Sequence, residues 1–573
     1  MKSNQSLIKL IRKIKVPKKL IIFSVVISII ASALELTIPL FTQNLIDNFE
    51  KIIKDKVYIF IFITIFIFSS ILNGISIYLL TKIGESIIYS LIERIWNHIS
   101  NLPLSFFDKN SAGEILSRII DDTSIINNYI TQTIPRVFPS LITLIGSLVI
   151  LFLLDWKITL ASMITFPIYI IVIMIMSDIV KKLSYETQLE IAKLSGKITN
   201  IISEIKLVKM SRSERSENSN INSILTNIYN LGLKGGIVNA LVAPFNNMLM
   251  LISIGLVLGY GGYRVSTESI SIGTLIAIIF YIMQLTDPIE NISEIFTGYK
   301  KTEGVSIRLK EIMDIEKENI SHIDNREYTS QYDLSFDKVT FSYDGIHNVL
   351  KEVSFSIPSN KVTALVGPSG SGKTTIFNII ARLYSIDSGN IKYGNESIYK
   401  IPLSEWRGNL GYVMQNNGII NGTIKENLIY ASDGYISNDQ MKYYSKLANI
   451  HSFISRLEKG YNTLIGESGI ELSGGEKQRI DIARNLIKKP NLLLLDEATS
   501  SLDSESEEII QKSIKYISSQ STTLIIAHRL STILQADQIL FIEDGKVTGK
   551  GTHEELLEQH QKYKHMIKLQ GLK

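Results

Sequence analysis

The stretch that decides the fold of the second half of the chain is Gly367-Pro368-Ser369-Gly370-Ser371-Gly372-Lys373-Thr374. It follows the apolar run 362–366, which predicts a buried strand, and precedes residues 375–380, which predict a helix. This order is typical of a phosphate-binding loop, because glycines let backbone N–H groups converge on oxygens and the helix start adds positive charge. The stretch predicts a nucleoside triphosphate site, with Lys373 on the terminal phosphates and the Thr374 hydroxyl on Mg²⁺.

The composition narrows the class of protein. A chain of 573 residues is too long for one ordinary domain. Hydrophobic residues make up 45% and are concentrated before about residue 300, as expected of a membrane domain. The formal charge of +4 is too small for this size to indicate nucleic-acid binding. There are no cysteines, which excludes disulfides, thiolate metal sites and a cysteine nucleophile.

Six apolar segments of about 20 residues are long enough to cross a bilayer. They cover residues 20–42, 57–80, 134–154, 158–177, 239–261 and 272–292. Residues 59–71 are apolar almost all round, which disfavours a buried helix of a soluble protein. The second and third segments, like the fourth and fifth, are separated by more than about fifty residues of basic, helical pattern. The positive-inside tendency places both intervals in the cytoplasm, so the helices should extend past the membrane there.

The chain divides into four predicted parts. Residues 1–19 combine apolar residues at helical spacing with a basic face, which predicts a helix on an anionic membrane surface. Residues 20–315 form the transmembrane domain, and the polar stretch 316–331 forms a linker. Residues 332–573 alternate strands and helices, the pattern of an α/β domain. The strands expected there include 334–336, 362–366, 492–495, 523–526 and 538–542.

Two acidic residues, Asp496 and Glu497, directly follow the apolar run 492–495. A carboxylate at such a strand end lies beside the phosphate loop, so Asp496 is the predicted Mg²⁺ ligand. The next carboxylate can orient and deprotonate the attacking water, so Glu497 is the predicted general base.

The segment Leu472-Ser473-Gly474-Gly475-Glu476 is similar to LSGGQ, the signature sequence of the ATP-binding cassette (ABC) family. Its serine and glycines lie at a predicted helix start, where N–H groups and a hydroxyl can reach a γ-phosphate. The resemblance implies that this segment completes the site on the phosphate loop of an opposite subunit. Glu476 replaces the usual glutamine and adds negative charge. We expect this change to be tolerated, because the residues before it contact phosphate.

Other residues resemble the same family in their order along the chain. Tyr343 matches the aromatic residue that stacks on adenine, and Gln415 matches the glutamine that senses Mg²⁺ and the attacking water. His528 matches the histidine that contacts the γ-phosphate, and residues 501–503 match the loop that crosses the dimer interface. The resemblance implies an ATP-binding set of Tyr343, Gly367, Pro368, Ser369, Gly370, Ser371, Gly372, Lys373, Thr374, Thr375 and Gln415, catalytic residues Glu497 and His528, and Mg²⁺ ligands Thr374, Gln415 and Asp496.

The membrane half resembles a type I exporter of this family. Residues 106–108, followed by residues 113–118 and Asp122, are similar to the first cytoplasmic coupling region, and residues 204–209 more loosely resemble the second. Residues 462–469 look like the segment that meets the coupling helices. The resemblance implies a polytopic α-helical membrane domain with six spans fused to an α/β P-loop nucleotide-binding domain. It also implies a half-transporter of the cell membrane, with its nucleotide domain in the cytoplasm.

The implied function is ATP-driven export of an amphipathic substrate by a homodimer or by a pair of related half-transporters. Alternatives within this architecture are a lipid flippase, a peptide or lantibiotic exporter and an ATP-gated channel. A soluble DNA-repair or chromosome-organising ATPase would need coiled-coil heptads instead of membrane-length spans. Glu35, inside the first span, is the candidate substrate residue and would favour a cationic compound. The alternative is that Glu35 lies near the outer leaflet, hydrated or paired within the helical bundle.

Overall fold

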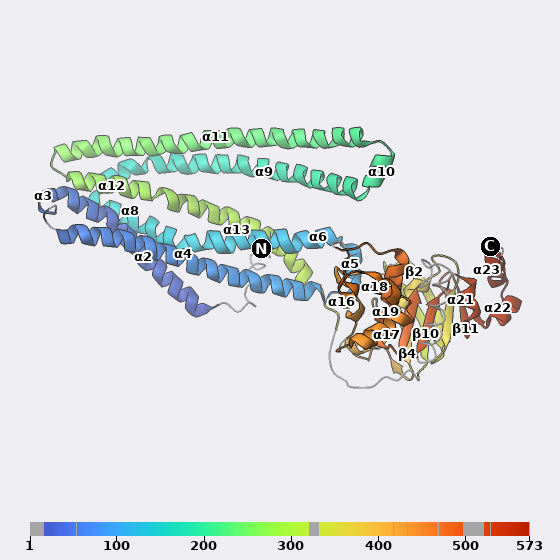
Figure 1. Cartoon of the computed structure of the whole chain (residues 1–573). Coiled ribbons are helices and arrows are strands. Elements are labelled where there is room, and N and C mark those ends of the chain that lie inside the picture. The colour runs from blue at the N-terminus through green and yellow to red at the C-terminus, as the bar shows by residue number, and fades with distance from the viewer. Residues whose placement is uncertain are drawn as a thin grey trace. The chain divides into compact units, whose positions relative to one another are not determined.

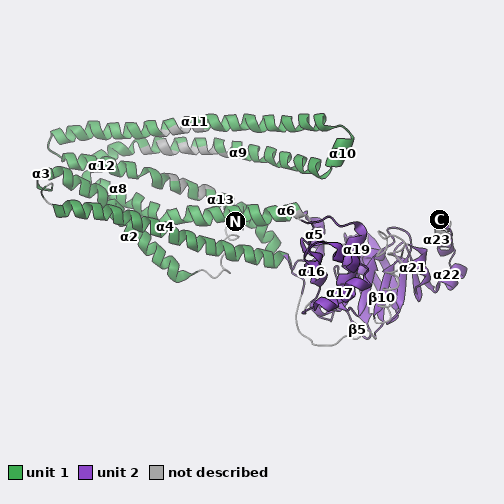
Figure 2. Ribbon diagram, in the orientation of Figure 1, with its two compact units in different colours: residues 1–99, 113–315 green, residues 100–112, 316–573 purple. Residues whose placement is uncertain are grey.

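The structure is a computed structural model that describes residues 17–52, 54, 56–319, 332–415, 418–432, 434–466, 469–496, 521–527 and 529–571. The chain forms two compact units, residues 1–99 with 113–315 and residues 100–112 with 316–573 (Figure 2). Residues 1–16 of the predicted surface helix and residues 320–331 of the predicted linker lie outside the described residues. The prediction placed residues 100–112 in the membrane domain, whereas the structure groups them with the second unit.

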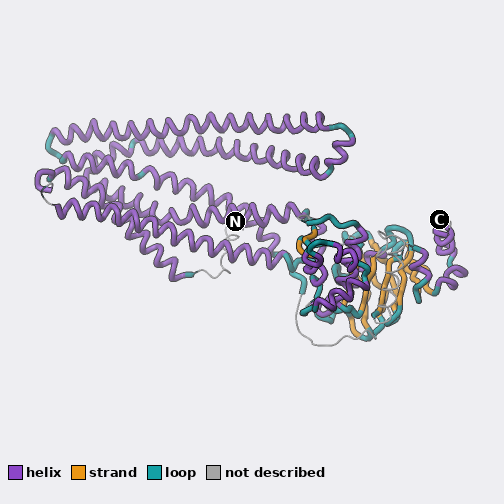
Figure 3. Tube along the Cα trace, in the orientation of Figure 1, coloured by secondary structure: helices purple, strands orange, loops and turns teal. Residues whose placement is uncertain are grey.

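The described residues of the first unit form helices joined by short turns (Figure 3). The long helices are α2 (Lys18–Asp47), α4 (Lys56–Ile99), α8 (Ile134–Met163), α9 (Thr165–Ser203), α11 (Glu214–Ser266), α12 (Ile272–Gln284) and α13 (Thr286–Met313). The short elements are α3 (Phe49–Ile52), α6 (Ala112–Ser117), η1 (Arg118–Asp122), α7 (Thr123–Asn128), η2 (Tyr129–Thr133) and α10 (Ile205–Met210), of which η1 and η2 are π-helical.

Five described segments are long and apolar enough to cross a membrane. They are Lys18–Asp47, Lys56–Ile99, Gly113–Met163, Asn247–Ser266 and Ile272–Ile289, and they cover most of five of the six predicted spans. The remaining prediction, 158–177, falls on the end of α8 and the start of α9, where several side chains are outside the described set. Large apolar side chains such as Phe60 and Ile63 are exposed on α4, as expected where lipid surrounds a helix.

The helices α9 and α11 run side by side and are joined by α10 (Figure 1). α11 has 53 residues, which corresponds to about 80 Å at 1.5 Å per residue, far more than a bilayer core of about 30 Å requires. Lys197 of α9 pairs with Glu217 of α11 at 2.7 Å. The helices in the interval between the predicted fourth and fifth spans are therefore much longer than a membrane span needs, as expected if they extend past the membrane.

A break within α8 separates the predicted third span from the fourth. Asp155 has non-helical backbone angles (φ −160°, ψ 107°), and its Oδ1 accepts hydrogen bonds from the N–H groups of Lys157 (2.9 Å) and Ile158 (3.0 Å). Its other carboxylate oxygen accepts a hydrogen bond of 2.5 Å from Arg264 of α11. The carboxylate therefore caps the helix that restarts here and holds it to the neighbouring helix.

The second unit contains α5 (Leu104–Lys109) and an α/β domain (Figure 1). Its strands are β1 (Leu334–Ser342), β2 (Asn348–Ile357), β3 (Val362–Val366), β4 (Ser388–Tyr393), β5 (Glu396–Ser397), β6 (Leu410–Val413), β7 (Gly422–Thr423), β8 (Leu464–Ile465), β9 (Leu492–Asp496), β10 (Thr522–Ile526), β11 (Gln538–Glu543) and β12 (Lys546–Gly551). Its other helices are α14 (Lys373–Ile380), α15 (Leu403–Gly408), α16 (Ile424–Ile429), α17 (Asn438–Leu447), α18 (His451–Arg456), η3 (Gly460–Asn462), α19 (Gly474–Lys488), α21 (Leu530–Leu534), α22 (His553–Gln559) and α23 (Gln561–Gly571).

Two larger sheets organise this domain. One has the strand order β12-β11-β3-β10-β9-β6 and is parallel except for β12, and the other is antiparallel with the order β2-β1-β4-β5. Alternate residues of β9 enter different cores: Leu492 and Leu494 pack with α14 and the antiparallel sheet, and Leu493 and Leu495 pack with α16 to α19. Burial of both faces of β9 explains why residues 492–495 are all apolar.

Candidate nucleotide-binding site

The phosphate loop joins β3 to α14, as the sequence predicts. Gly367 has φ +153°, and a side chain there would place its Cβ 2.0 Å from the Ile542 carbonyl oxygen. Gly372, which precedes α14, has the left-handed φ of +104°. These two positions therefore require glycine, because one has no space for a Cβ and the other has a conformation that other residues rarely adopt.

The side chain of Lys373 folds back over its own loop. Its Nζ donates hydrogen bonds to the carbonyl oxygens of Gly367 (2.9 Å) and Pro368 (2.8 Å), and the residue is 6% exposed. Ser371 is buried, and its hydroxyl has no hydrogen-bond partner among the described residues. Thr374 is exposed at the first turn of α14. The loop thus presents an ammonium group, a buried hydroxyl and an exposed hydroxyl at one helix start, a set suited to phosphates.

The ends of the parallel strands bring further predicted residues to the same sheet edge. Ile526 pairs with Leu365 on one side and with Asp496 on the other, so Asp496 lies level with the last residues of β3. Val413 pairs with Leu495, which places Gln415 just beyond the same edge. Asp496 is 3% exposed and Gln415 is exposed. Glu497 and His528, which follow β9 and β10, lie outside the described residues.

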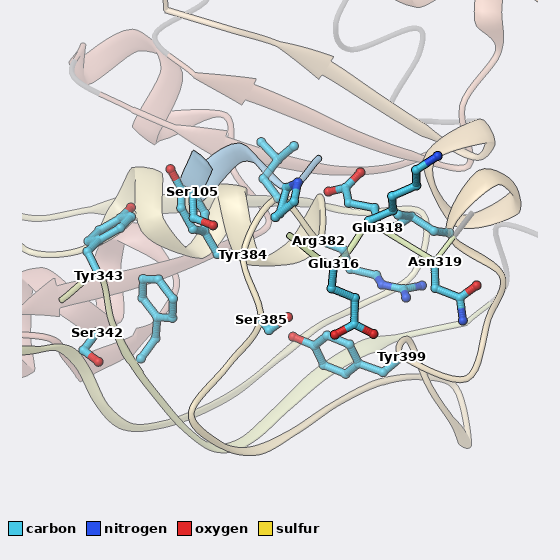
Figure 4. A pocket seen from close by; sticks show the side chains of 15 residues that line it. Ser105, Glu316, Glu318, Asn319, Ser342, Tyr343, Arg382, Tyr384, Ser385 and Tyr399 are labelled. Carbon is cyan, nitrogen blue, oxygen red and sulfur yellow. The ribbon is translucent and has the colours of Figure 1, made fainter. Parts of the chain in front are cut away.

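Tyr343 lies beside the phosphate loop. Its hydroxyl is 3.2 Å from the Thr375 hydroxyl on α14. Its ring meets Tyr384 edge-on, with the ring centroids 5.1 Å apart, and the residue remains 48% exposed. Tyr343 and Tyr384 both line a cavity of about 540 Å³ (Figure 4). The structure therefore brings the predicted adenine-stacking residue next to the predicted phosphate loop.

The signature segment begins α19. Ser473 is the N-cap: its hydroxyl accepts a hydrogen bond from the Glu476 N–H (3.3 Å), and its own N–H donates to the Glu476 carboxylate (2.8 Å). This reciprocal pair is a capping box, which gives Glu476 a structural role at the position where the family has glutamine. The spacing of Ser473 and Glu476 in the sequence indicates such a box, in addition to the charge that Glu476 adds.

Hydrogen bonds between residues far apart in the sequence connect α5 and its flanking residues to the nucleotide domain. The Tyr384 hydroxyl donates a hydrogen bond to the Asp108 carboxylate of α5. Burial raises the pKa of Tyr384, and Asp108 raises this pKa further, so the phenol keeps the proton that it donates. Arg407 forms two hydrogen bonds of 2.7 and 2.9 Å to the carboxylate of Glu318, and the Glu318 N–H donates to the Asn101 carbonyl (2.8 Å).

Comparison with known proteins places the chain in a family. Residues 21–289 match the family described as ABC transporter transmembrane region, and residues 350–500 match the family described as ABC transporter. Two proteins named multidrug resistance ABC transporter ATP-binding and permease protein, from Lactococcus lactis subsp. cremoris (strain MG1363) and subsp. lactis (strain IL1403), are each 34% identical over 97% of this chain and 94% of their own length.

A solved structure of a bacterial Atm1-family ABC exporter with ATP bound is also similar. It has a TM-score of 0.82 and 25% sequence identity, and the match covers 96% of this chain and 98% of the other. These likenesses extend over both the helical unit and the phosphate-loop domain. The chain therefore belongs to the ABC transporter family, as a multi-pass half-transporter of the cell membrane that binds ATP and couples its hydrolysis to export.

Proposed function

We propose that two copies of this chain form a homodimer that exports small amphipathic compounds. The lactococcal relatives are named multidrug resistance ABC transporter ATP-binding and permease proteins, which supports the export of such compounds. The observation that carries the proposal is the hydrogen bond between Tyr384 and Asp108. Tyr384 contacts the ring of Tyr343 beside the phosphate loop, and Asp108 belongs to α5, which follows the membrane helix α4 along the chain. The ring of Tyr343 is therefore connected, through Tyr384, to the segment that follows α4 along the chain.

The chain supplies a complete set of groups for ATP hydrolysis. Tyr343 stacks on adenine, Lys373 binds the terminal phosphates, Glu497 is the general base and His528 holds the γ-phosphate. Mg²⁺ prefers hard oxygen ligands, and the chain offers three: the Thr374 hydroxyl, the Gln415 amide oxygen and the Asp496 carboxylate. They fit this ion because Asp496 and the residues around Gln415 lie at the same sheet edge. When bound, Mg²⁺ neutralises charge on the phosphates.

Each site also requires the signature segment of a second copy. Ser473 and Gly474 are exposed at the start of α19, where the N–H groups of the first turn can bind the partner's γ-phosphate. Outside the nucleotide domain, α10 exposes Leu207 (62%) and Met210 (85%). Apolar side chains this exposed on a cytoplasmic helix favour a protein partner.

A cavity of about 640 Å³ in the nucleotide domain fits α10 of the partner. Its lining includes the apolar residues Ile419, Ile470 and Leu472, which complement the apolar side chains of α10, and it carries one acidic and one basic residue, Glu471 and Lys477. In the cysteine-free parent, Leu207→Cys combined with Ile470→Cys should give a disulfide-linked dimer on mild oxidation. Non-reducing gel electrophoresis of membranes measures this product, which requires Cα atoms within about 7 Å.

The single-cysteine variants are the controls for this cross-link, together with Leu207→Cys combined with Lys546→Cys on the distant strand β12. A dimer band that forms only with the first pair supports the homodimer. An active transporter in which that pair stays monomeric under oxidation would contradict this arrangement.

Glu35 is the proposed substrate residue. Gln284 of α12 donates a hydrogen bond to it, and Asp287 of α13 lies near enough to interact electrostatically. Two carboxylates between the first and last spans favour a cationic headgroup. Glu35→Gln should raise the concentration of a cationic compound that half-stimulates ATPase activity by about tenfold, and leave stimulation by neutral compounds unchanged.

This experiment uses proteoliposomes, with Glu50→Gln in the exposed helix α3 as the matched control. Equal stimulation by both classes of compound, as in the parent, would remove the assignment of Glu35. Testing drugs, lipids and peptides in the same vesicles, with transport into inside-out vesicles, distinguishes a drug exporter from a lipid flippase or a peptide exporter.

A further inference from the structure

The helix α19 carries three polar residues that the ATP site does not use: Asp481, Arg484 and Asn485. Asp481 is 4% exposed and Asn485 is 6% exposed. Buried polar groups are costly unless they form hydrogen bonds, so their partners indicate what they do. All three direct their hydrogen bonds to the segments on either side of Gln415.

The residues before Gln415 are held by Asn485 and Asp481. The Asn485 side chain accepts a hydrogen bond from the Tyr412 N–H (2.8 Å) and donates one to the Tyr412 carbonyl (3.3 Å), as a neighbouring strand would. The Asp481 carboxylate accepts a hydrogen bond from the Met414 N–H (3.3 Å). Met414 directly precedes Gln415, so the end of β6 is fixed to α19 up to that residue.

The residues after Gln415 are held by Arg484. Its guanidinium donates to the carbonyl oxygens of Gly418 (3.0 Å) and Asn427 (2.8 Å). Asn427 exchanges two hydrogen bonds with the backbone of Ile420, at 2.8 and 2.9 Å. Consequently α19 holds the chain on both sides of Gln415.

Asp481 is the central member of this group. Its Oδ1 lies 3.4 Å from an Arg484 nitrogen and 3.3 Å from the Asn485 amide nitrogen. Burial raises the pKa of Asp481 to about 6, although Arg484 and the Met414 N–H act in the opposite direction. Keeping a charged carboxylate buried here costs free energy of folding. Such a cost is expected where the group has a role in positioning its neighbours.

We propose that Asp481 is a positioning residue for ATP hydrolysis, which sets the place of Gln415 through its hydrogen bond to the Met414 N–H. The helix α19 begins at the signature segment, and Asp481 lies about two turns further along it. A movement of the start of α19 relative to the partner's ATP therefore also moves Asp481. Asp481 thus links the signature segment, which acts on the partner's ATP, to Gln415, which acts on the ATP bound by the same chain. The inference rests on the proposed roles of Gln415 and Ser473.

A double-mutant cycle in the full-length transporter, reconstituted in proteoliposomes, tests the inference. Asp481→Ala and Asp481→Asn are each made in the native and the Gln415→Ala backgrounds, and kcat and KM for ATP are measured. In the native background, Asp481→Ala should lower kcat about tenfold and leave KM within about twofold of the parent value. In the Gln415→Ala background, the same substitution should change kcat by less than about twofold. Asp481→Asn should keep at least about half of kcat, because its amide oxygen can still accept the Met414 N–H.

The control is Ser445→Ala in α17, a buried polar residue outside these contacts, which should leave kcat unchanged. An equal fall in kcat in both backgrounds, or a lowered melting temperature with normal kcat, overturns the inference. If Asp481→Ala does not fold, Asn485→Ala takes its place in the cycle with the same expected pattern. Normal kcat in Gln415→Ala alone would instead refute the proposed role of Gln415, and the inference with it.

Discussion

Lys373→Ala should lower ATPase turnover of the reconstituted transporter by about 100-fold or more and abolish ATP-dependent export. Removing one preorganised donor to developing charge costs about 10²–10³ in kcat. The two loop carbonyls that now accept hydrogen bonds from Nζ hold the ammonium where the terminal phosphates are expected. Phosphate release and uptake into inside-out vesicles measure the two losses.

The matched control is Lys546→Ala, which removes an exposed lysine at the start of β12 in the same domain. That variant should keep the parent turnover. Lys373→Arg should be nearly as inactive as the alanine variant, because the planar guanidinium does not replace a compact ammonium in a closed loop. Turnover above half of the parent value in Lys373→Ala would contradict the assignment.

Glu497→Gln should bind ATP but hydrolyse it about 10²–10⁴ times more slowly, the range expected when a general base is lost. The glutamine can still accept a hydrogen bond from water but cannot take its proton. Because ATP then persists between two copies, the variant should accumulate as an ATP-bound dimer. Retention of labelled ATP after desalting and single-turnover kinetics provide the measurements.

Glu458→Gln, an exposed glutamate after α18, is the control for this substitution and should behave as the parent. If Glu497→Gln turns over at a near-normal rate, another residue must activate the water. If it loses ATP binding as well, Glu497 would be needed to build the site and not only for the proton transfer.

Much of the fold follows from local pattern. The run of four leucines at 492–495 predicts a strand, and β9 covers it. The structure explains the continuous apolar run, because alternate residues of this strand enter two separate cores. The phosphate loop is equally local, since strand, glycines and helix are adjacent in the sequence. The expected break between the third and fourth spans coincides with Asp155, whose carboxylate caps the following turn.

The remaining features depend on contacts between distant residues. The family resemblance indicates a coupling region at residues 106–108, but no spacing rule connects Asp108 with Tyr384 or Glu318 with Arg407. The sequence therefore did not predict these partners. The hydrogen bond from Met414 to Asp481 likewise joins positions that are 67 residues apart. By contrast, the capping role of Glu476 could have been predicted from the sequence, because Ser and Glu three residues apart at a helix start form a known capping pattern.

The membership of residues 100–112 in the second unit has a consequence for exchanging parts between transporters. The nucleotide-binding module is discontinuous in the sequence, since it includes a segment encoded more than 200 residues before its main body. A chimera joined at residue 316 would keep Tyr384 and Arg407 but replace Asp108 and Asn101 with those of another chain. Grafts that carry both segments should therefore preserve transport more often than grafts of the carboxy-terminal half alone.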